Sequence, residues 1–431
     1  MGEDKFTAIV IGAGPAGSTA AYLLAREGLD VLLIEKGDTP GGKNMFGGRM
    51  YSHALNRIIP NFWEEAPVQR PVVREVITFL TEDRSLSFVC QDESWNRSPY
   101  HSFTLLRAEF DAWLASKAEE AGAELACGIR VDDLVMEKGR VVGVRAGEDE
   151  LLADVVIAAD GVNSLMAQKA GLRKELEPHQ VATGVKEVIE LPAEVISQRF
   201  QVADNGGTAQ LFVGSCTCGM QGGGFLYTNK NSISLGLVVS ASELQQNPYR
   251  PVDLMEDFKA HPHIAPLIEG GEVVEYSAHL VPEAGLEMVP GLYGDGIVVV
   301  GDAAGFVLNL GYQVRGMDLA IASGEAAARA VKEARAKNDF SRQSLAVYQE
   351  YLKRDFVFKD LEAYRKAPAF LKNKRLYTIY PQLATGLFSR VFSVNGTMPV
   401  HLLHIVLHQL KQNQVGWLQL AGDAWKGGRS L

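Results

Sequence analysis

Glycine residues near the amino terminus have the spacing of a loop that binds a diphosphate. Gly12, Gly14 and Gly17 follow an apolar run, and Pro15 lies between them, where a first helical turn needs no N–H group. Gly12 permits a tight turn, Gly14 lets the backbone approach a pyrophosphate, and Gly17 allows close packing of the following helix on the strand. The amino end of that helix offers unpaired N–H groups and a positive dipole end to the anion. The chemistry predicted here is dinucleotide binding.

An acidic residue stands where such a site recognises a ribose. Glu35 ends a second apolar run, at residues 31–34, after a helix-like segment at 18–26 that stops at Gly28. A carboxylate at this place accepts hydrogen bonds from both ribose hydroxyl groups and would repel a 2′-phosphate. The strand, glycine turn, helix and second strand together indicate a βαβ unit.

The elements that must position these residues are visible as changes of pattern along the chain. Short, nearly continuous apolar runs predict buried parallel strands at 6–11, 31–34, 155–159 and 296–300. Alternating patterns at 72–91 and short, glycine-rich strands at about 176–284 favour a mostly antiparallel sheet. Helices are expected at 106–122, at 317–336 and through most of 341–431.

Composition excludes several classes of protein. The chain has 431 residues, of which 47% are hydrophobic and 22% charged, as in soluble globular proteins. A formal net charge of −10 argues against nucleic acid as a partner. Four cysteines are too few for a disulfide scaffold and fit a reducing cytosol. We expect neither a signal peptide nor a transmembrane helix, because the apolar runs are short.

Three separated stretches resemble FAD proteins of the glutathione-reductase-like group, in particular the p-hydroxybenzoate-hydroxylase branch: residues 9–28, 155–164 and 294–324. The resemblance implies that Asp302 contacts the ribitol and pyrophosphate parts of FAD and that the next helix points its amino end at the flavin. It also implies that Arg107 lies near the FAD phosphates and that the backbone at Val131 touches the adenine. The alternatives are a helix cap at Asp302 and a surface ion pair at Arg107.

The predicted FAD site contains further residues from the same stretches and from the glycine-rich loop after the second strand. Cations in that loop and before the last helix are candidates for tuning the flavin potential, because they would stabilise reduced, anionic flavin. The alternative is that each is an exposed loop charge. The residues added are Ala16, Lys36, Lys43, Asn44, Gly48, Arg49, Asp160, Gly161, Gly301, Gly311, Arg315, Gly316 and Met317.

The implied fold class is α/β, or α+β overall. A Rossmann-like FAD-binding domain of glutathione-reductase type, formed by residues 1–75, 100–175 and 285–340, would be interrupted by a mostly antiparallel β-sheet domain for substrate or acceptor, formed by residues 76–99 and 176–284. Residues 341–431 would form a helical C-terminal region.

Essentially the whole chain resembles the FixC branch of the electron-transfer-flavoprotein:quinone oxidoreductase family. The segments that carry this resemblance are 41–55, 185–192, 222–239, 274–285 and 309–321. It implies an FAD-dependent oxidoreductase that takes electrons from an electron-transfer flavoprotein (FixA/FixB-like) and passes them to a quinone or a ferredoxin-like partner. The few cysteines predict a cytoplasmic protein, and the resemblance leaves open a peripheral contact with the inner face of the membrane.

One departure from the full-length quinone oxidoreductases concerns an iron–sulfur cluster. Those proteins carry a C-terminal module with four cysteines for a [4Fe–4S] cluster, whereas no cysteine follows Cys218 here. As in the FixC branch, a small separate ferredoxin-like protein (FixX-like) would supply the cluster. Whether the chain reduces quinone by itself is thereby an open question.

Two other functions remain open. The FAD motifs are shared with hydroxylases and prenyl reductases, which act directly on an organic substrate with NAD(P)H, although no second GxGxxG motif is present for a nicotinamide domain. The chain could also be a flavin-binding scaffold without catalysis. No single catalytic acid or base is predicted.

Two clusters of potential metal ligands are better explained without a metal. Cys216 and Cys218 are only two ligands and lie in a glycine-rich strand region. His401, His404 and His408 share one helical face, but Lys411 continues their row as the polar stripe of an amphipathic helix. We therefore predict no metal site.

Overall fold

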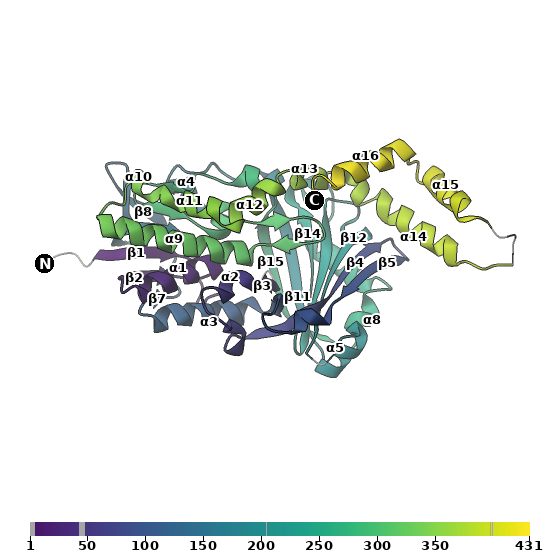
Figure 1. Ribbon diagram of the computed structural model, residues 1–431, viewed down its shortest axis with the longest axis horizontal. Coiled ribbons are helices and arrows are strands. Elements are labelled where there is room, and N and C mark those ends of the chain that lie inside the picture. The colour runs from purple at the N-terminus through teal and green to yellow at the C-terminus, as the bar shows by residue number, and fades with distance from the viewer. Residues whose placement is uncertain (1–4, 43–47, 204, 397, 399) are drawn as a thin grey trace.

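Two sheets lie side by side along the long axis of the molecule, as the computed structural model shows (Figure 1). The structure describes residues 5–42, 48–203, 205–396, 398 and 400–431. The first sheet carries the amino-terminal strand, the second lies in the middle of the molecule, and helices of the C-terminal region run beside the first sheet and then beyond the second.

The first sheet contains the predicted parallel strands. Its order is β16 (Tyr293–Gly294), β17 (Ile297–Val299), β10 (Asp149–Ala158), β1 (Lys5–Ile11), β2 (Val31–Ile34) and β7 (Glu124–Ala126). The pairs from β17 to β7 are parallel, which confirms the expected strand type. β10 begins earlier than expected because its first half pairs antiparallel with β9 (Arg140–Ala146), which in turn carries β8 (Asp133–Glu137).

Helix α1 (Pro15–Arg26) packs between α3 (Arg107–Glu120) and α9 (Met317–Lys337). It begins at Pro15, before the expected residue 18, because proline is tolerated at the first helical position. A Cβ atom at Gly324 of α9 would lie 2.3 Å from the carbonyl oxygen of Ala16, so the two helices approach closely only because this residue is glycine. The short helices α2 (His53–Asn56) and α4 (Leu165–Lys169) complete this part of the fold.

The second sheet is mostly antiparallel, as expected. Its order is β15 (Glu272–Pro282), β11 (Val181–Glu190), β14 (Ser232–Ser240), β13 (Gly222–Thr228), β12 (Gly207–Gly214), β4 (Val68–Leu80), β6 (Ser102–Leu105) and β3 (Arg49–Tyr51), with β5 (Ser85–Gln91) on β4. Only the β12–β4 pair is parallel among the described pairs of this sheet. The helices that accompany it are α5 (Ala193–Phe200), α6 (Ala241–Leu244), α7 (Pro251–Ala260) and α8 (Ala265–Ile268).

Strand β4 runs across one of the predicted domain boundaries. Its first residues pair with β6, and its remainder pairs with β12 and β5. The division at residue 75 therefore falls inside a continuous strand, and β6, which was assigned to the FAD-binding segment 100–175, belongs to the second sheet. The domain boundaries stay a prediction, and β4 is the element that crosses them.

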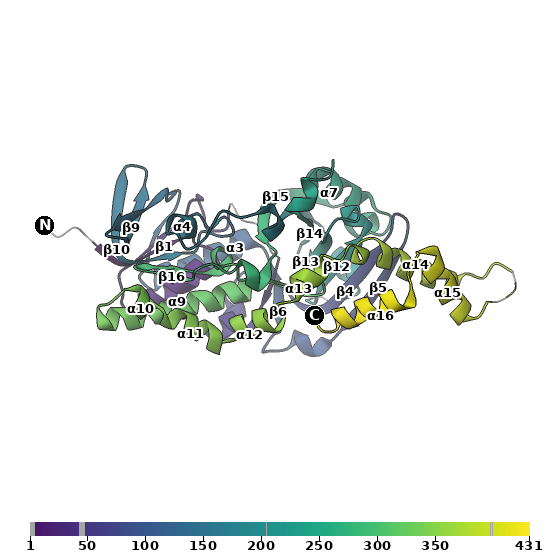
Figure 2. The ribbon, with the colours of Figure 1, turned by 90° about the horizontal axis from the view of Figure 1, so that it is seen from above.

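The C-terminal region is helical, as predicted. α10 (Arg342–Leu345), α11 (Val347–Arg354) and α12 (Phe356–Ala363) pack against α9. After α13 (Ala367–Leu371), α14 (Ile379–Phe392) contacts β4 and β5, α15 (Leu402–Gln412) lies beyond the second sheet, and α16 (Trp417–Gly427) runs back to contact α13 (Figures 1 and 2). Within the described residues, no helix is both long enough and apolar enough to cross a membrane.

Candidate functional site

The glycine turn lies between the end of β1 and the start of α1. Gly12 has a φ of +102°, and a Cβ atom there would lie 2.4 Å from the carbonyl oxygen of Ala159. A Cβ atom at Gly17 would lie 1.9 Å from the carbonyl oxygen of Gly12. At Gly14 the nearest atom to such a Cβ would be Nη2 of Arg107, at 3.9 Å. Two glycines thus let backbone segments touch, and the third keeps space open in front of the helix.

The amino end of α1 is not capped by a side chain. Gly14 is the N-cap residue, and no side-chain hydrogen bond closes that end of the helix. Gly14, Pro15 and Ala16 all line a large cavity. The first N–H groups of α1 can therefore bind an anion in this cavity, which is the role predicted for the turn.

The carboxylate of Glu35 is fixed beside the turn. Its Oε2 atom accepts a hydrogen bond from the N–H of Ala13 at 3.0 Å, and its Oε1 atom accepts one from the N–H of Gly37 at 2.8 Å. Each carboxylate oxygen has a further lone pair for a ribose hydroxyl. The neighbouring Lys36 is exposed, and Val131 is buried in the core of the first sheet.

Arg107 and Asp302 lie on the other side of the turn. The Arg107 side chain is buried and pairs with Asp111, with Nη2 and Oδ2 2.6 Å apart. Asp302 lies in a short 3-10 helix, Gly301–Ala304, and is half-buried against the cavity. Burial raises the pKa of Asp302, and the charge of Arg107 opposes this shift. The two residues are close enough to interact electrostatically and both face the space in front of α1.

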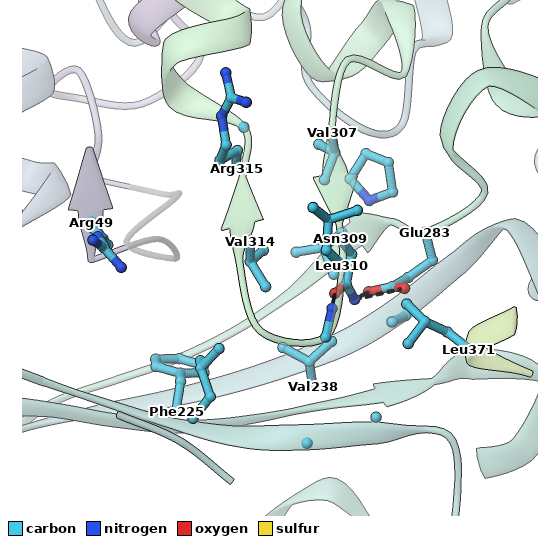
Figure 3. A pocket seen from close by; sticks show the side chains of 18 of the residues that line it. Arg49, Phe225, Val238, Glu283, Val307, Asn309, Leu310, Val314, Arg315 and Leu371 are labelled. Atoms are coloured by element: carbon cyan, nitrogen blue, oxygen red, sulfur yellow. Dashed lines mark hydrogen bonds between the residues drawn. The ribbon is translucent and has the colours of Figure 1, made fainter. Parts of the chain in front are cut away.

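These segments enclose a cavity of about 470 Å³. It reaches from the glycine turn to the face of the second sheet, where Phe225 and Val238 lie below the turn between β18 (Leu308–Asn309) and β19 (Val314–Arg315) (Figure 3). The predicted site residues that line it are Gly14, Pro15, Ala16, Gly48, Arg49, Arg107, Gly161, Gly301, Asp302, Gly311, Arg315, Gly316 and Met317. The structure therefore brings together residues from five separate stretches of the sequence.

Other predicted residues support the cavity from outside its lining. Gly12, Gly17 and Glu35 shape and fix the turn, as described above. Asp160 follows β10, and its Oδ2 atom accepts a hydrogen bond from the N–H of Met166 at 3.0 Å. Its Oδ1 atom is buried without a hydrogen-bond partner among the described residues, and burial raises its pKa. Lys43 and Asn44 lie outside the described residues.

The two described cations predicted to tune the flavin are paired with carboxylates. Arg315 precedes α9 in the two-stranded ribbon of β18 (Leu308–Asn309) and β19 (Val314–Arg315). Its guanidinium pairs with Asp318 at 2.5 Å and with Asp360 at 2.6 Å, and it points away from the ribbon's turn (Figure 3). Arg49 forms an ion pair with Glu75. Because a partner carboxylate weakens each cation's field, their effect on a flavin stays a prediction.

The amino end of α9 faces the cavity. Gly316 is its N-cap residue without a side-chain cap, and both Gly316 and Met317 line the cavity. A positive helix end at this place would stabilise negative charge on a bound ring.

A cluster of polar side chains in the part of the cavity away from the glycine turn was not predicted from the sequence. Glu283, Asn309 and Tyr377 line it together with Leu371. Asn309 Nδ2 donates to both carboxylate oxygens of Glu283, at 3.4 and 3.3 Å, and the Tyr377 hydroxyl donates to the carbonyl oxygen of Leu371 at 2.7 Å. These residues come from three distant segments, and no local pattern in the sequence marks them.

The cysteine pair and the histidine row were predicted not to bind a metal, and the structure shows where these side chains lie. Cys216 is buried, and burial raises its pKa to about 12, whereas Cys218 is exposed. His401 is the N-cap residue of α15 without a side-chain cap, and His404 and His408 follow on that helix. Among the described residues, no group of three or more metal-ligating side chains comes together.

The residues of the cavity fit an extended dinucleotide such as FAD. The open space at Gly14, the uncapped α1 and the fixed carboxylate of Glu35 match a diphosphate and a ribose. The cavity's mostly apolar lining and its volume of about 470 Å³ suit a fused ring system, and the amino end of α9 borders it. This agreement rests on the chain's own geometry.

Comparison with protein families gives matches to residues 8–281 and 367–431. A family described as "FAD dependent oxidoreductase" matches residues 8–205. A family described as "ETF-QO, ubiquinone-binding" matches residues 181–281, and the "ETF-QO/FixC family C-terminal domain" matches residues 367–431.

Curated relatives match over the full length. Protein FixC of Escherichia coli (strain K12) is 50% identical over 428 residues, which is 99% of each chain. The probable electron transfer flavoprotein-quinone oxidoreductase YdiS of the same strain is 48% identical over 431 residues, 100% of each chain. Protein FixC of Azorhizobium caulinodans is 39% identical over 436 residues, again 100% of each.

Solved structures share the fold at lower identity. A geranylgeranyl bacteriochlorophyll reductase-like protein from Thermoplasma acidophilum is 23% identical with a TM-score of 0.73, covering 98% of this chain and 100% of the other. A myxobacterial chondrochloren halogenase, described as FAD-dependent, is 19% identical with a TM-score of 0.64, covering 99% and 91%. The expected Rossmann-like fold and FAD as cofactor are confirmed, and the chain belongs to the ETF-QO/FixC family of FAD-dependent oxidoreductases.

Proposed function

We propose that this protein takes electrons from an electron-transfer flavoprotein of the FixA/FixB type and passes them through FAD to a quinone. The observation that carries the proposal is a single cavity that joins the glycine turn to the apolar face of the second sheet. FAD, when bound, accepts and releases the electrons. The curated relatives, among them one named as a probable electron transfer flavoprotein-quinone oxidoreductase, support this assignment.

In this proposal the chain's own residues hold the FAD. The turn at Gly14 and the amino end of α1 bind the diphosphate, with Arg107 beside it. Glu35 accepts hydrogen bonds from the adenosine ribose, and Asp302 contacts the ribitol and pyrophosphate. The amino end of α9 faces the ring and stabilises the negative charge of the reduced state.

The second sheet supplies a surface that suits a quinone. Phe212 and Val238 lie within the segment that matches the ubiquinone-binding family, and both line the cavity. Leu371 and Leu376 cover the same space from the C-terminal region. An apolar ring with an isoprenoid tail gains free energy by leaving water for such a lining.

A small ferredoxin-like protein of the FixX type is a further proposed partner. A [4Fe–4S] cluster requires four closely placed cysteines. This chain's four, Cys90, Cys127, Cys216 and Cys218, lie in different surroundings, since two are exposed, one is buried and one is intermediate. A separate chain would therefore provide the cluster.

The C-terminal extension, defined here as residues 379–431, is proposed to rest on the cytoplasmic face of a membrane. Its exposed apolar side chains are Phe388, Val391, Phe392, Val394, Met398, Val400, Leu402, Leu403, Leu407, Trp417, Leu418 and Trp425. Its charged residues are Arg390, Lys411, Lys426 and Arg429, against Asp423, which pairs with Arg375. Apolar, tryptophan-containing helices with basic residues suit an anionic lipid surface.

Anaerobic reduction of the purified, FAD-loaded protein tests the electron path. We expect fast flavin bleaching by a reduced electron-transfer flavoprotein, slow bleaching by NADPH, and reoxidation by a short-chain ubiquinone. Fast reduction by NADPH with substrate-dependent oxygen uptake would contradict the proposal and favour an enzyme that acts directly on an organic substrate.

A matched pair of variants locates the quinone. Val238→Trp fills the cavity from the second sheet, whereas Val273→Trp adds the same bulk at an exposed position of β15. We expect V238W to slow reoxidation by ubiquinone at least tenfold while reduction by the electron-transfer flavoprotein continues, and V273W to change neither. Equal effects of the two variants would place the quinone elsewhere.

A further inference from the structure

Glu283 is a carboxyl group that lies between two cavities. It directly follows β15 and lines the large cavity described above. It also lines a second cavity of about 10 Å³, together with Leu361, Tyr364 and Pro368 from α12 and the start of α13. A space of that size is close to the minimum that holds one water molecule. Glu283 therefore connects the proposed quinone space with a small site beside the C-terminal helices.

Asn309 fixes the carboxyl group in this place. Its Oδ1 atom accepts the N–H of Gly311 at 2.8 Å, which sets the orientation of the amide. The amide nitrogen then points at Glu283, with its two oxygens at 3.4 and 3.3 Å (Figure 3). No lysine, arginine or histidine within the described part of the chain forms an ion pair with Glu283, so this amide is its polar side-chain partner.

The surroundings favour the protonated form of the acid. Burial among protein atoms raises the pKa of Glu283 to about 7, and the hydrogen bond from Asn309 opposes that shift. Four tyrosines line the same two cavities: Tyr227, Tyr312, Tyr364 and Tyr377. The charged side chains that line the large cavity are Arg49, Arg107, Asp302 and Arg315, and Leu431 lines it as well. A carboxyl group with such a pKa exchanges its proton readily near neutral pH.

We infer that Glu283 delivers a proton to a quinone bound in the large cavity and regains it through the small one. The inference rests on the proposed function. Reduction of a quinone to its hydroquinone consumes two electrons, which come from FAD, and two protons, which come from solvent. The O–H bond of Glu283 breaks, an O–H bond forms at one quinone oxygen, and water in the small cavity reprotonates the carboxylate. The second proton reaches the other oxygen from the open side of the large cavity.

Infrared spectroscopy tests the carboxyl group without any turnover. Wild-type protein without quinone should show a protonated-carboxyl band that disappears with a midpoint near pH 7, and Glu283→Gln should lack it. Asn309→Leu removes the opposing hydrogen bond and should move the midpoint to higher pH. A band that persists in E283Q, or the absence of a band that titrates near neutral pH in the wild type, would overturn the inference.

Quinone reduction provides the second measurement. With a short-chain ubiquinone, the wild-type rate should decline above pH 7, where Glu283 loses its proton. In E283Q the rate should be at least tenfold lower at pH 6 and should show no such decline. The rate with ferricenium, which takes up no proton, should be unchanged. Glu287→Gln, an exposed acid four residues along, is the control. If E283Q keeps the pH profile of the wild type, the inference about Glu283 is overturned and the proposed function stands. If the wild-type protein shows the titrating carboxyl band but reduces no quinone, the proposed function is overturned, and with it the acceptor of the Glu283 proton.

Discussion

The guanidinium of Arg107 forms two hydrogen bonds with the carboxylate of Asp111, one helical turn further along α3. The Nε–Oδ1 distance is 2.9 Å, and the Nη2–Oδ2 distance is 2.6 Å. Both side chains are buried, and Nη2 of Arg107 also faces the space in front of Gly14. One arginine thus neutralises a buried acid and presents positive charge to the proposed diphosphate site.

Substitutions at this pair separate its two roles. Arg107→Met alone leaves the charge of Asp111 buried without compensation and should lower the free energy of unfolding by about 3–5 kcal/mol. The double variant R107M/D111L should regain most of that stability, because an apolar pair replaces an ion pair. Its affinity for FAD should remain low, since no cation faces the diphosphate. Urea unfolding of the apo-protein and flavin fluorescence titration measure the two quantities, and wild-type FAD affinity in the double variant would limit Arg107 to a structural role.

Gly17→Ala should disrupt the dinucleotide turn. The added Cβ atom would lie 1.9 Å from the carbonyl oxygen of Gly12, so α1 must move away from β1. We expect the dissociation constant for FAD to rise at least tenfold, which is a loss of about 1.4 kcal/mol or more in binding free energy, and the protein to purify with less FAD. Gly422→Ala is the control, because a Cβ atom there meets no atom within 4 Å. The ratio of flavin absorbance to protein absorbance reports the result, and full FAD content in G17A would contradict the predicted packing role.

The first sheet and its turn were predictable because their signals are local. Each predicted parallel strand is a short apolar run, and the residues from Lys5 to Ile34 form one continuous βαβ unit. Two starts were misplaced: α1 begins at Pro15, before the expected residue 18, and β10 begins early because its first half pairs with a hairpin strand that an apolar-run criterion does not detect.

The rest of the site depends on long-range packing. Glu283 and Asn309 meet only because the end of β15 and the β18–β19 ribbon enclose the same space. Likewise, the pairing of Arg315 with Asp360 requires α12 to lie against α9. A single sequence shows which side chains carry charge, but these partners are far apart along the chain, so their charge neutralisation could not be foreseen.

Asp423 should anchor the carboxyl end of the C-terminal extension. It pairs with Arg375 at 2.7 Å and accepts hydrogen bonds from Asn373 and Tyr380, and these contacts hold its pKa well below the usual range. Asp423→Asn should release α16 and speed cleavage of the extension in limited proteolysis severalfold. The stabilisation is present above the unfolded pKa of about 3.9 and is lost as pH falls towards the lower folded pKa. D83N, at a side chain that is 73% exposed, is the control, and equal cleavage of both variants would argue against the anchor.

The extension should bind anionic lipid vesicles through its exposed apolar side chains. Phe392 is 78% exposed and Leu418 is 90% exposed, so replacing both with serine leaves the packed core intact. F392S/L418S should lower binding to phosphatidylglycerol vesicles by about thirtyfold or more, since each of the two buried apolar side chains contributes of the order of 1 kcal/mol or more. V273S/V274S, which alters exposed residues of β15, is the control. Co-sedimentation measures the binding, and an equal loss in both double variants would exclude the extension as the lipid-binding surface.

The raised pKa of Glu283 should make the stability of the apo-protein depend on pH. The folded pKa is about 7, against about 4.3 in an unfolded chain, so the folded state holds this proton more tightly. Its stabilisation is complete below about pH 4 and is lost as pH rises through 7, by about 4 kcal/mol in all. E283Q lacks this dependence, so the difference in unfolding free energy, wild type minus E283Q, should fall by about that amount between pH 4 and pH 8. The opposite pH dependence of His279, whose pKa burial lowers to about 4, cancels in this difference. Urea unfolding at several pH values measures this difference. For the control E287Q, the difference from wild type should not change with pH. A difference for E283Q that does not change with pH would show that Glu283 is already ionised in the folded protein.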